Sequence, residues 1–381
     1  MSVRFFRPLV VSGFLFASQL LHAVALNVPP PPAIAARAYI LTDFHSGTTL
    51  ASLDADKRVD PASLTKLMTA YITFGALKDG RLKIDQTLTV SEHAWKAEGS
   101  RMFINVNTAV PVSELIRGMI VVSGNDASIT LAEGIGGSED SFANLMNAMA
   151  AKLGMKNTHY MNATGLPNLQ HYTTARDLSI LAAAIIRDFP AYFPIYSMKE
   201  YTHNGIKQPN RNLLLWRDPG VDGMKTGHTD AAGFCLTSTL HRGDRRVIAV
   251  VLGTASDQVR ATESLKLLNY GIQFFDTPKI YAKGKTLQPI QVWKGEHNSV
   301  SVGFNQDVFL TIPKGAGNRV KAQLVSQSPL LAPIAGGQVV GKVVFTLDGK
   351  AFGETPAVAL QPVNRAGFFG RAWDGMKLWF H

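Results

Sequence analysis

The chain has 381 residues, of which 46% are hydrophobic and 17% are charged, and it carries a formal net charge of +10. This balance excludes intrinsic disorder, and the length favours two domains with short tails over a single domain. The only cysteine, Cys235, excludes an intramolecular disulfide, so the fold must be held by its hydrophobic cores.

The first residues carry the pattern of a secretory signal peptide. Two arginines precede an apolar run from Leu9 to Leu21, and Ala23-Val24-Ala25 forms a small-residue cleavage site. The apolar run is too short to cross a hydrocarbon core of roughly 30 Å as a helix. We therefore expect residues 1–25 to be removed on export, and residues 26–35, with four consecutive prolines, to form an extended linker.

The charge of the exported chain bears on its partners. Without the two N-terminal arginines the chain still has an excess of basic residues. Such a charge suits anionic lipid headgroups or polyanionic wall material. Export, together with the lack of a recognition motif in the sequence, argues against a nucleic-acid partner.

Residues 36–278 carry the pattern of an α+β domain. Residues 38–53 alternate apolar and polar side chains around a turn, which predicts a β-hairpin. Apolar spacing after Pro61 predicts a helix that begins at Ser63 and ends at Asp79-Gly80. Further helices are expected near residues 112–121, 126–135, 139–153, 174–188 and 256–275. Strand-like runs at residues 234–240 and 245–253 predict one sheet assembled from distant segments and covered by helices.

Residues 279–362 differ from the preceding part and predict a small all-β domain. Turn residues separate several short runs of strand-forming residues, which are Leu287–Val292, Val308–Ile312, Val320–Val325 and Val339–Leu347.

Three short motifs are candidates for chemistry, and the first is Ser63-Leu64-Thr65-Lys66. Ser63 opens a helix and Lys66 lies one turn later, so both side chains share a face. A serine hydroxyl needs a base, and a lysine can serve if burial and nearby positive charge keep it neutral part of the time. The helix N-terminus would favour a developing oxyanion. Alone, this motif is better explained by an ordinary lysine on the surface of a helix.

The second motif is Ser123-Gly124-Asn125, where Gly124 is expected to allow a tight turn. Ser123 could relay a proton and Asn125 could hold a substrate amide, although a turn with two capping side chains also fits. The third motif, Lys225-Thr226-Gly227, leads into the strands. Its lysine and hydroxyl would bind a terminal carboxylate, and Gly227 would permit close approach of a peptide backbone. The alternative is an edge strand with a solvated lysine.

The three motifs in this order resemble the set found in penicillin-binding proteins and class A β-lactamases. The chain is similar to the serine D-alanyl-D-alanine carboxypeptidases, the low-molecular-mass penicillin-binding proteins with a C-terminal β-domain. The likeness runs from about Ala36 to the end and is strongest at residues 61–66, 115–127 and 221–234. It implies a β-lactamase-like domain, an antiparallel sheet with helices, followed by a small all-β domain.

The resemblance also implies roles for individual residues. Ser63 would be the acyl-enzyme nucleophile and Lys66 its base, while Ser123 and Lys225 would carry the proton to the leaving D-alanine. The backbone N–H groups of Ser63 and His228 would form the oxyanion hole.

Two arginines, Arg211 and Arg260, match family arginines that support the Lys225 region and the substrate carboxylate. A structural salt bridge would explain either of them equally well. No metal or cofactor is expected.

The C-terminal residues 363–381 predict an amphipathic helix. One face carries bulky apolar groups, which are Phe369, Ala372, Trp373, Met376, Trp379 and Phe380, and the other carries Arg371, Asp374 and Lys377. This pattern fits a helix in a membrane interface, and the family resemblance favours an anchor. A helix that caps a domain is the alternative.

These observations predict a penicillin-sensitive carboxypeptidase on the periplasmic face of the bacterial inner membrane. Its substrate would be the peptidoglycan stem peptide, from which it removes the terminal D-alanine. A β-lactamase is the first rival, but the region around Gly165-Leu166-Pro167-Asn168 lacks the glutamate that would activate a deacylating water. A D,D-endopeptidase is chemically closer, and a catalytically idle wall-binding protein is disfavoured by the intact motifs.

Overall fold

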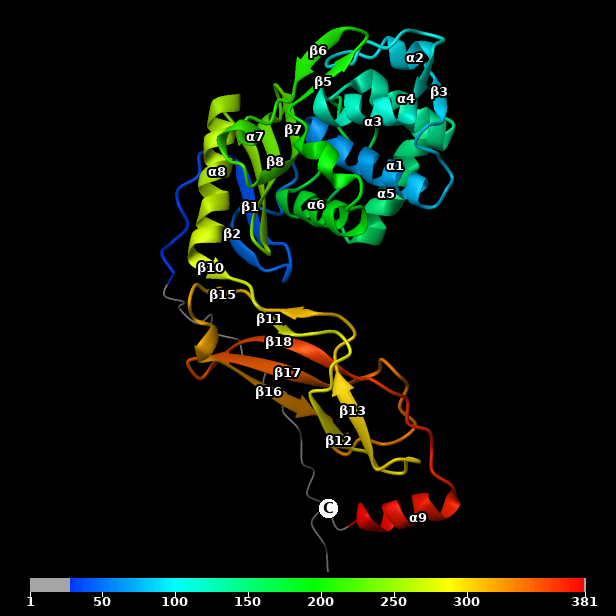
Figure 1. Ribbon diagram of the computed structural model, residues 1–381, viewed down its shortest axis with the longest axis vertical. Coiled ribbons are helices and arrows are strands. Elements are labelled where there is room, and N and C mark those ends of the chain that lie inside the picture. The colour runs from blue at the N-terminus through cyan, green and yellow to red at the C-terminus, as the bar shows by residue number, and fades with distance from the viewer. Residues whose placement is uncertain (1–27, 380–381) are drawn as a thin grey trace, which may run out of the picture. The chain divides into compact units, whose positions relative to one another are not determined.

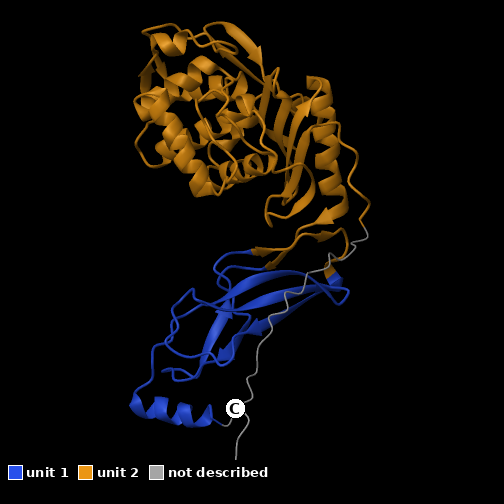
Figure 2. Cartoon of the chain, turned by 180° about the vertical axis from the view of Figure 1, so that it is seen from behind, with its two compact units in different colours: residues 1–27, 281–307, 318–381 blue, residues 28–280, 308–317 orange. Residues whose placement is uncertain are grey.

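The computed structural model describes residues 28–379, so the predicted signal peptide lies outside the described residues. The chain forms two compact units (Figure 2). The first unit comprises residues 28–280 and 308–317, and the second comprises residues 281–307 and the chain from 318 onward.

A five-stranded antiparallel sheet forms the centre of the first unit. Its strand order is β2-β1-β9-β8-β7, so the two N-terminal strands join three strands from the later part of the chain. The strands are β1 (Ala38–Asp43), β2 (Thr49–Leu53), β7 (Val221–Thr229), β8 (Gly233–Arg242) and β9 (Arg245–Thr254). The predicted hairpin and the assembly from distant segments are confirmed. Strand β7 lies at an edge of the sheet.

Both faces of this sheet are buried, and the alternation of side chains along its strands divides the core in two. Ile40 and Val250 point into one core, whereas Leu41 and Val251 point into the other. The first core is covered by the helices α1 (Lys66–Lys78), α3 (Val112–Val121), α4 (Asn125–Gly136), α5 (Glu139–Leu153) and α6 (Ala175–Asp188). The second core is covered by α8 (Asp257–Phe274), which lies on the opposite side of the sheet (Figure 1).

Shorter elements connect these parts. Strand β3 (Thr87–Thr89) pairs with β4 (Ala109–Pro111) across an intervening short helix, α2 (Glu92–Trp95). Strands β5 (Glu200–His203) and β6 (Ile206–Pro209) form a hairpin. The remaining short elements are α7 (Leu214–Arg217) and the 3-10 turns η1 (Ala62–Thr65) and η2 (Phe193–Ser197).

The described part of the expected linker, residues 28–35, lies along α8 rather than free of the domain. The backbone N–H of Ala35 donates to the carboxylate of Glu263 at 3.1 Å, and the Tyr270 hydroxyl donates to the carbonyl of Pro29 at 2.9 Å. Val28 and Ile34 pack against the second core. The prolines keep this segment extended while its apolar side chains hold it on the helix.

Residues 308–317 belong to the first unit although they are distant in sequence from its other strands. Short strand pairs hold them there, β10 (Phe275–Asp276) with β15 (Ile312–Pro313) and β11 (Lys279–Tyr281) with β14 (Val308–Phe309). The Thr311 hydroxyl lies 2.6 Å from that of Ser46, and Thr277 donates to the buried carboxylate of Asp43 at 2.6 Å.

The second unit contains a five-stranded antiparallel sheet with the order β12-β13-β18-β17-β16. Its strands are β12 (Gln288–Gln291), β13 (Ser299–Gly303), β16 (Val320–Ser326), β17 (Val339–Leu347) and β18 (Lys350–Ala359), and the 3-10 turn η3 (Gly317–Arg319) precedes β16. Strands β13 and β18 were not among the predicted runs. In β18, Gly353 and Pro356 break the strand pattern, and β13 is short.

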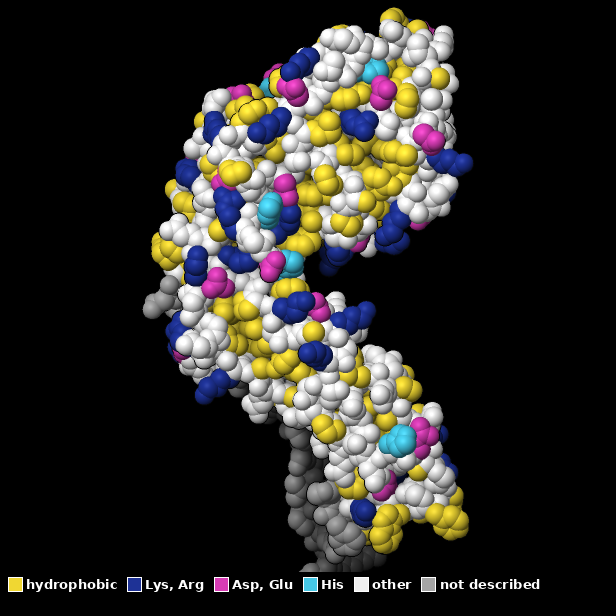
Figure 3. All heavy atoms as spheres, viewed as in Figure 1, with side chains coloured by type: hydrophobic (Ala, Val, Ile, Leu, Met, Phe, Trp, Pro, Cys, Tyr) yellow, Lys and Arg dark blue, Asp and Glu magenta, His cyan; other side chains and the backbone are white. Residues whose placement is uncertain are grey.

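The helix α9 (Phe368–Lys377) follows this sheet. Its Asp374 side chain accepts a hydrogen bond from the backbone N–H of Lys294 at 2.6 Å, which holds the polar face on the second unit. The aromatic face is open to solvent, with Phe369 86% and Trp373 57% exposed, and Figure 3 shows apolar side chains at this surface. Phe380 lies outside the described residues. Among residues 28–379, no helix combines the length and the apolar character that crossing a bilayer requires.

Candidate active site

Ser63 and Lys66 meet where a 3-10 turn runs into a helix. Ser63 lies inside η1, and Lys66 is the first residue of α1, so the helix starts three residues later than predicted. The Lys66 amine lies 3.0 Å from the Ser63 hydroxyl oxygen. Lys66 is almost fully buried, whereas Ser63 is partly exposed. The amine is therefore shielded from water while the hydroxyl remains accessible.

The surroundings of the Lys66 amine favour its neutral form. Besides Ser63, the amine contacts two carbonyl oxygens, the side-chain oxygen of Asn125 and the backbone oxygen of Thr164, each at 2.6 Å. A neutral amine has two hydrogens for these two acceptors, and its lone pair is left for the serine hydroxyl. Burial, aided by the nearby charge of Arg211, lowers the pKa of Lys66 to about 7.

The beginning of α4 fixes the position of Asn125. The Asn125 amide nitrogen donates to the backbone carbonyl of Glu98 at 2.5 Å, so its oxygen is turned toward Lys66. The next residue, Asp126, is buried and accepts hydrogen bonds from the backbone N–H groups of Met102 and Phe103, both at 2.9 Å. This carboxylate ties the loop before α3 to the helix that carries Asn125.

The turn at the second motif differs from the prediction. Ser123 itself has φ +64°, whereas Gly124 has φ −58°, so the left-handed conformation belongs to the serine. The glycine is needed for close packing, because a Cβ at Gly124 would lie 2.8 Å from Oδ1 of Asp126 and 3.1 Å from the backbone nitrogen of Met102. The prediction of a tight turn is correct, but the reason given for the glycine is wrong.

Lys225 is buried in the middle of β7 and forms the second serine–lysine pair. Its amine donates to the Ser123 hydroxyl at 2.9 Å and to the carbonyl of Thr226 at 3.0 Å. Burial, together with the charges of Lys66, Arg211 and Arg260, lowers the pKa of Lys225 well below its usual value. Because these positive charges act on Lys225, an anion bound near it would be stabilised.

Gly227 brings β7 against the turn that holds Ser63. A Cβ at this position would lie 3.2 Å from the backbone oxygen of Pro61 and 3.2 Å from the backbone nitrogen of Ser63. The close approach expected at this glycine therefore involves the protein's own turn η1. With no side chain here, the strand and Ser63 lie next to each other.

The remaining predicted residues surround the end of β7. Thr226 is buried and His228 is exposed, with its ring 4.0 Å from that of Phe234. Arg260 is buried, and its guanidinium nitrogens reach the carbonyls of Gly227 and Arg211 at 3.4 Å each. Among residues 28–379, neither Arg211 nor Arg260 forms an ion pair with a carboxylate, so the structural salt bridge considered from the sequence is not found.

Two groups at the site were not foreseen from the sequence, the Thr164 carbonyl and His171. The His171 ring is buried, lies 2.8 Å from the Thr65 hydroxyl and accepts from the backbone N–H of Met161 at 3.2 Å. Burial, with smaller contributions from His159 and Lys66, lowers the pKa of His171 to about 4. This neutral ring connects Thr65, in the turn that holds Ser63, to the loop that presents Thr164. A backbone carbonyl leaves no signature in a sequence, and an isolated histidine leaves only a weak one.

This arrangement combines the parts that an acyl transfer needs. It has a hydroxyl beside a shielded amine, a second hydroxyl beside another amine, and a strand edge next to Ser63. In the described part of the chain, no cluster of three metal-ligating side chains is present.

The comparisons with known proteins agree with this chemistry. Residues 25–256 match the model of the D-alanyl-D-alanine carboxypeptidase family, and residues 275–365 match the model of the penicillin-binding protein 5 C-terminal domain. The chain belongs to the D-alanyl-D-alanine carboxypeptidase family. The predicted family is therefore confirmed, as is the predicted class of enzyme.

Relatives in this family match along most of their length. The D-alanyl-D-alanine carboxypeptidase DacA of Escherichia coli is 43% identical over 372 residues, which cover 94% of this chain and 92% of that protein. The protein of the same name from Haemophilus influenzae is 44% identical over 354 residues, 91% of this chain and 90% of the relative.

Solved structures of carboxypeptidases and penicillin-binding proteins confirm the predicted fold. Penicillin-binding protein 5 from Haemophilus influenzae superposes with a TM-score of 0.86 at 44% identity, covering 88% of this chain and all of that one. Penicillin-binding protein D2 from Listeria monocytogenes, solved with bound ampicillin, has a TM-score of 0.57 at 32% identity and covers 64% of this chain and all of that one.

Proposed function

We propose that the chain is a serine-type D-alanyl-D-alanine carboxypeptidase in which Ser63 is the nucleophile and Lys66 its base. The observation that carries this proposal is the environment of the Lys66 amine, whose two carbonyl neighbours leave its lone pair for the Ser63 hydroxyl. As Ser63 attacks the amide carbon between the two D-alanines, its proton passes to Lys66 and an ester begins to form.

The second serine–lysine pair completes the step. When the carbon–nitrogen bond of the amide breaks, Lys225 and Ser123 carry the proton that Lys66 took from Ser63 to the leaving nitrogen, so both amines end the step in the form in which they began it. D-Alanine then leaves with a neutral amine. Water later attacks the Ser63 ester, which releases the shortened peptide and restores the hydroxyl.

The substrate lies along the free edge of β7 in this proposal. The backbone N–H groups of Ser63 and His228 stabilise the oxyanion, and Asn125 holds the substrate amide. The terminal carboxylate is received by Thr226 and Gly227, with Arg211 and Arg260 behind them. Two arginines that form no ion pair with a carboxylate within residues 28–379 support this assignment.

Labelling with a fluorescent penicillin tests the nucleophile. The wild-type chain and the exposed-serine control Ser197→Ala should label equally, and Ser63→Ala should not label at all. Support for β-lactam binding comes from the Listeria relative solved with ampicillin and again with cefotaxime. Equal labelling of Ser63→Ala would exclude Ser63 as the nucleophile.

Product analysis tests the substrate. Mass spectrometry of a pentapeptide digest should show free D-alanine and a tetrapeptide, neither of which Ser63→Ala should produce. Cleavage of cross-linked peptide dimers without release of D-alanine would instead identify an endopeptidase.

We further propose that the chain is exported by residues 1–25 and held at the periplasmic face of the inner membrane by α9. The support is the orientation of α9, whose Asp374 contacts the second unit while Phe369 and Trp373 face solvent. Aromatic side chains of this kind favour the interface of a bilayer.

Membrane binding can be tested on the mature protein. Deleting residues 364–381 should release it from vesicles, and so should replacing Phe369 and Trp373 by serine, which preserves the Asp374 contact. Replacing the exposed Leu145, remote in sequence from the helix, serves as the control. Retention of both variants on the vesicles would exclude α9 as the anchor.

A further inference from the structure

Glu139 is a largely buried carboxylate that the proposed mechanism does not use. It lies in the first turn of α5, where its side chain is 14% exposed, and burial raises its pKa above the usual value. Helix capping does not explain it, because the Ser138 hydroxyl already accepts from the backbone N–H of Ser141, and the neighbouring Asp140 is exposed to solvent. Burying a carboxylate costs free energy unless its partners compensate, so the contacts of Glu139 indicate its role.

The carboxylate of Glu139 holds the loop that contacts Lys66. Its Oε1 accepts a hydrogen bond from the backbone N–H of Ala163 at 2.9 Å. The carbonyl of Ala163 accepts from the Thr69 hydroxyl of α1 at 2.8 Å, and the next carbonyl, that of Thr164, lies 2.6 Å from the Lys66 amine. The peptide groups on both sides of Ala163 are therefore fixed, and this limits the direction of the Thr164 carbonyl.

Helix α5 holds this loop at a second point. The side chain of Asn147 donates to the carbonyl of Tyr160 and accepts from the backbone N–H of the same residue, both at 2.8 Å. Farther along the loop, Gly165 has φ +86°, and a Cβ there would collide with the backbone oxygen of Ala62. The loop is thus packed between α5 and η1, so a change at Glu139 would be felt by groups that contact the site.

His93 joins the carboxylate of Glu139 to a second carboxylate on α4. Its ring nitrogens lie 3.5 Å from Oε2 of Glu139 and 3.1 Å from Oε1 of Glu133. Helix α4 begins with Asn125, whose side-chain oxygen is the other carbonyl at the Lys66 amine. A single imidazole therefore lies between the helix that carries one acceptor of Lys66 and the helix that fixes the other.

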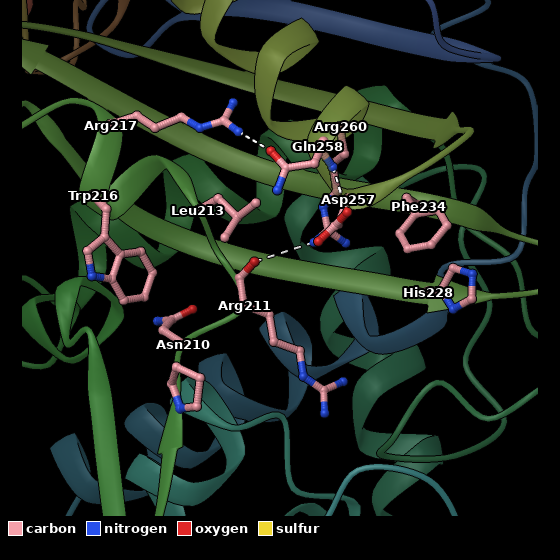
Figure 4. A pocket seen from close by; sticks show the side chains of 11 residues that line it. Asn210, Arg211, Leu213, Trp216, Arg217, His228, Phe234, Asp257, Gln258 and Arg260 are labelled. Atoms are coloured by element: carbon pink, nitrogen blue, oxygen red, sulfur yellow. Dashed lines mark hydrogen bonds between the residues drawn. The ribbon is translucent and has the colours of Figure 1, made fainter.

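The negative charge of Glu139 also acts on Lys66. Burial and the charge of Arg211 lower the pKa of Lys66, whereas the carboxylates of Asp126 and Glu139 act in the opposite direction. Figure 4 shows that the Arg211 side chain extends away from Arg260, whose guanidinium contacts the backbone carbonyl of Arg211. The titratable groups that interact with Lys66 are Asp126, Glu139, His171, Arg211 and Lys225, and those that interact with Glu139 are His93, Glu133 and Asp140.

We propose that Glu139 is a positioning residue for acyl transfer, which directs the Thr164 carbonyl onto the Lys66 amine through the backbone N–H of Ala163. Its charge favours the protonated form of that amine, and His93 holds the carboxylate in place. Glu139 acts through the loop and through its charge rather than by contact with the reacting atoms. The inference rests on the proposed function, because it takes Lys66 as the base.

Two substitutions of Glu139 separate its hydrogen bond from its charge. Glu139→Gln keeps an oxygen for the Ala163 N–H, so the plateau rate of acylation by a fluorescent penicillin should stay within about twofold of wild type. The rising limb of its pH profile should move to lower pH by on the order of half a unit, because Lys66 loses a charge that favours its protonated form. Glu139→Ala should move the limb in the same direction and lower the plateau by on the order of tenfold, because the hydrogen bond is also lost.

Two further variants complete the design. Asp140→Asn removes the neighbouring charge from the same turn of α5 and leaves the Ala163 contact intact, so its limb and plateau should match those of the wild type. His93→Ala should lower the plateau by about threefold, because Glu139 loses its support while its hydrogen bond remains possible. Melting curves of all variants verify folding, and if Glu139→Ala does not fold, the limb of Glu139→Gln decides.

The outcomes separate this inference from the proposed function. If the acylation rate of the wild-type chain shows no rising limb, or if Lys66→Ala is still acylated normally, the proposed function fails. If the wild-type limb is present but both Glu139 variants behave as Asp140→Asn does, Glu139 has no positioning role and the proposed function stands. A lower melting temperature of Glu139→Ala with an unchanged limb and plateau would identify a purely structural residue and overturn the inference. A plateau of Glu139→Gln as low as that of Glu139→Ala would also overturn it.

Discussion

The site contains two serine–lysine pairs that are built in different ways. Ser63 and Lys66 are three residues apart, and local helical geometry brings them together at 3.0 Å. Ser123 and Lys225 are separated by 102 residues, and their contact of 2.9 Å depends on the packing of α4 and its preceding turn against β7. The first pair is therefore a local structure, whereas the second exists only in the folded domain.

The two amines also differ in their neighbours. Lys66 has two carbonyl acceptors besides the serine, while Lys225 has one, the carbonyl of Thr226. Lys66 has a pKa of about 7, so both of its protonation states are populated near neutral pH. In the proposed mechanism, these two similar pairs divide the reaction, with Lys66 accepting the first proton and Ser123 and Lys225 delivering it.

The largest effect is expected for Lys66→Ala. Acylation by penicillin and release of D-alanine should both fall by about 10³-fold or more, because the hydroxyl loses its base. Stopped-flow acylation and peptide kinetics measure these losses. Lys66→Arg should fail as well, since a guanidinium stays charged at neutral pH. Near-normal activity of either variant would remove Lys66 from the role of base.

A smaller effect, on the order of a hundredfold, is expected for Lys225→Ala with peptide substrates. Ser123→Ala should have a similar effect, and the double variant should be little worse than either single one, because the two residues act as a unit. Peptide kcat and KM of the three variants form the test. Fully additive losses of activity in the double variant would show that Ser123 and Lys225 act independently.

His171→Ala should lower acylation by on the order of tenfold, since the ring connects Thr65 to the loop that presents Thr164. It should also destabilise the protein by about 1–3 kcal/mol through unsatisfied buried groups. His159→Ala is the control, because that ring bonds an exposed carbonyl. Thermal melting and acylation kinetics are measured for both variants. If His171→Ala and His159→Ala have the same melting temperature and acylation rate, the His171 ring does not support the loop that presents Thr164.

The smallest effect is a shift of the pH profile. Lys66 must be neutral to accept a proton, so the acylation rate should rise as the pH increases through about 7 and then level off. The charge of Arg211 helps to lower this pKa, so Arg211→Gln should move the rising limb to higher pH. Arg217→Gln, a nearby arginine that does not contribute to this pKa, should leave it in place. If the rising limb of the pH profile of Arg211→Gln stays at the same pH, it does not report the titration of Lys66.

The sequence predicts the first pair better than the second for a physical reason. The spacing of Ser63 and Lys66 follows from helical geometry, which needs no tertiary information. The contact between Ser123 and Lys225 is tertiary, and only the family resemblance suggested it. The Thr164 carbonyl could not be predicted, because every residue has such a group and its direction depends on the folded loop.

The same limit applies to the fold. Strands such as β9 contribute apolar residues alternately to the two cores of the first unit, and their apolar runs predicted them as strands. Strand β18 was missed because its glycine and proline weaken the pattern, although cross-strand pairing with β17 holds it in the sheet. A local sequence pattern reveals a strand only where the neighbouring strands and both faces of the sheet favour residue types that are typical of strands.

Gly227 has a consequence for how such an enzyme could escape an antibiotic. The distance between β7 and the serine turn is set by the absence of a side chain at this position. A side chain at Gly227 that narrowed the entrance against a lactam ring would also press on the backbone of Ser63, the residue that we propose as the nucleophile. Substitution of Gly227 is therefore not expected to give resistance by blocking the entry of a β-lactam. Substitutions that block its entry would have to lie farther from Ser63.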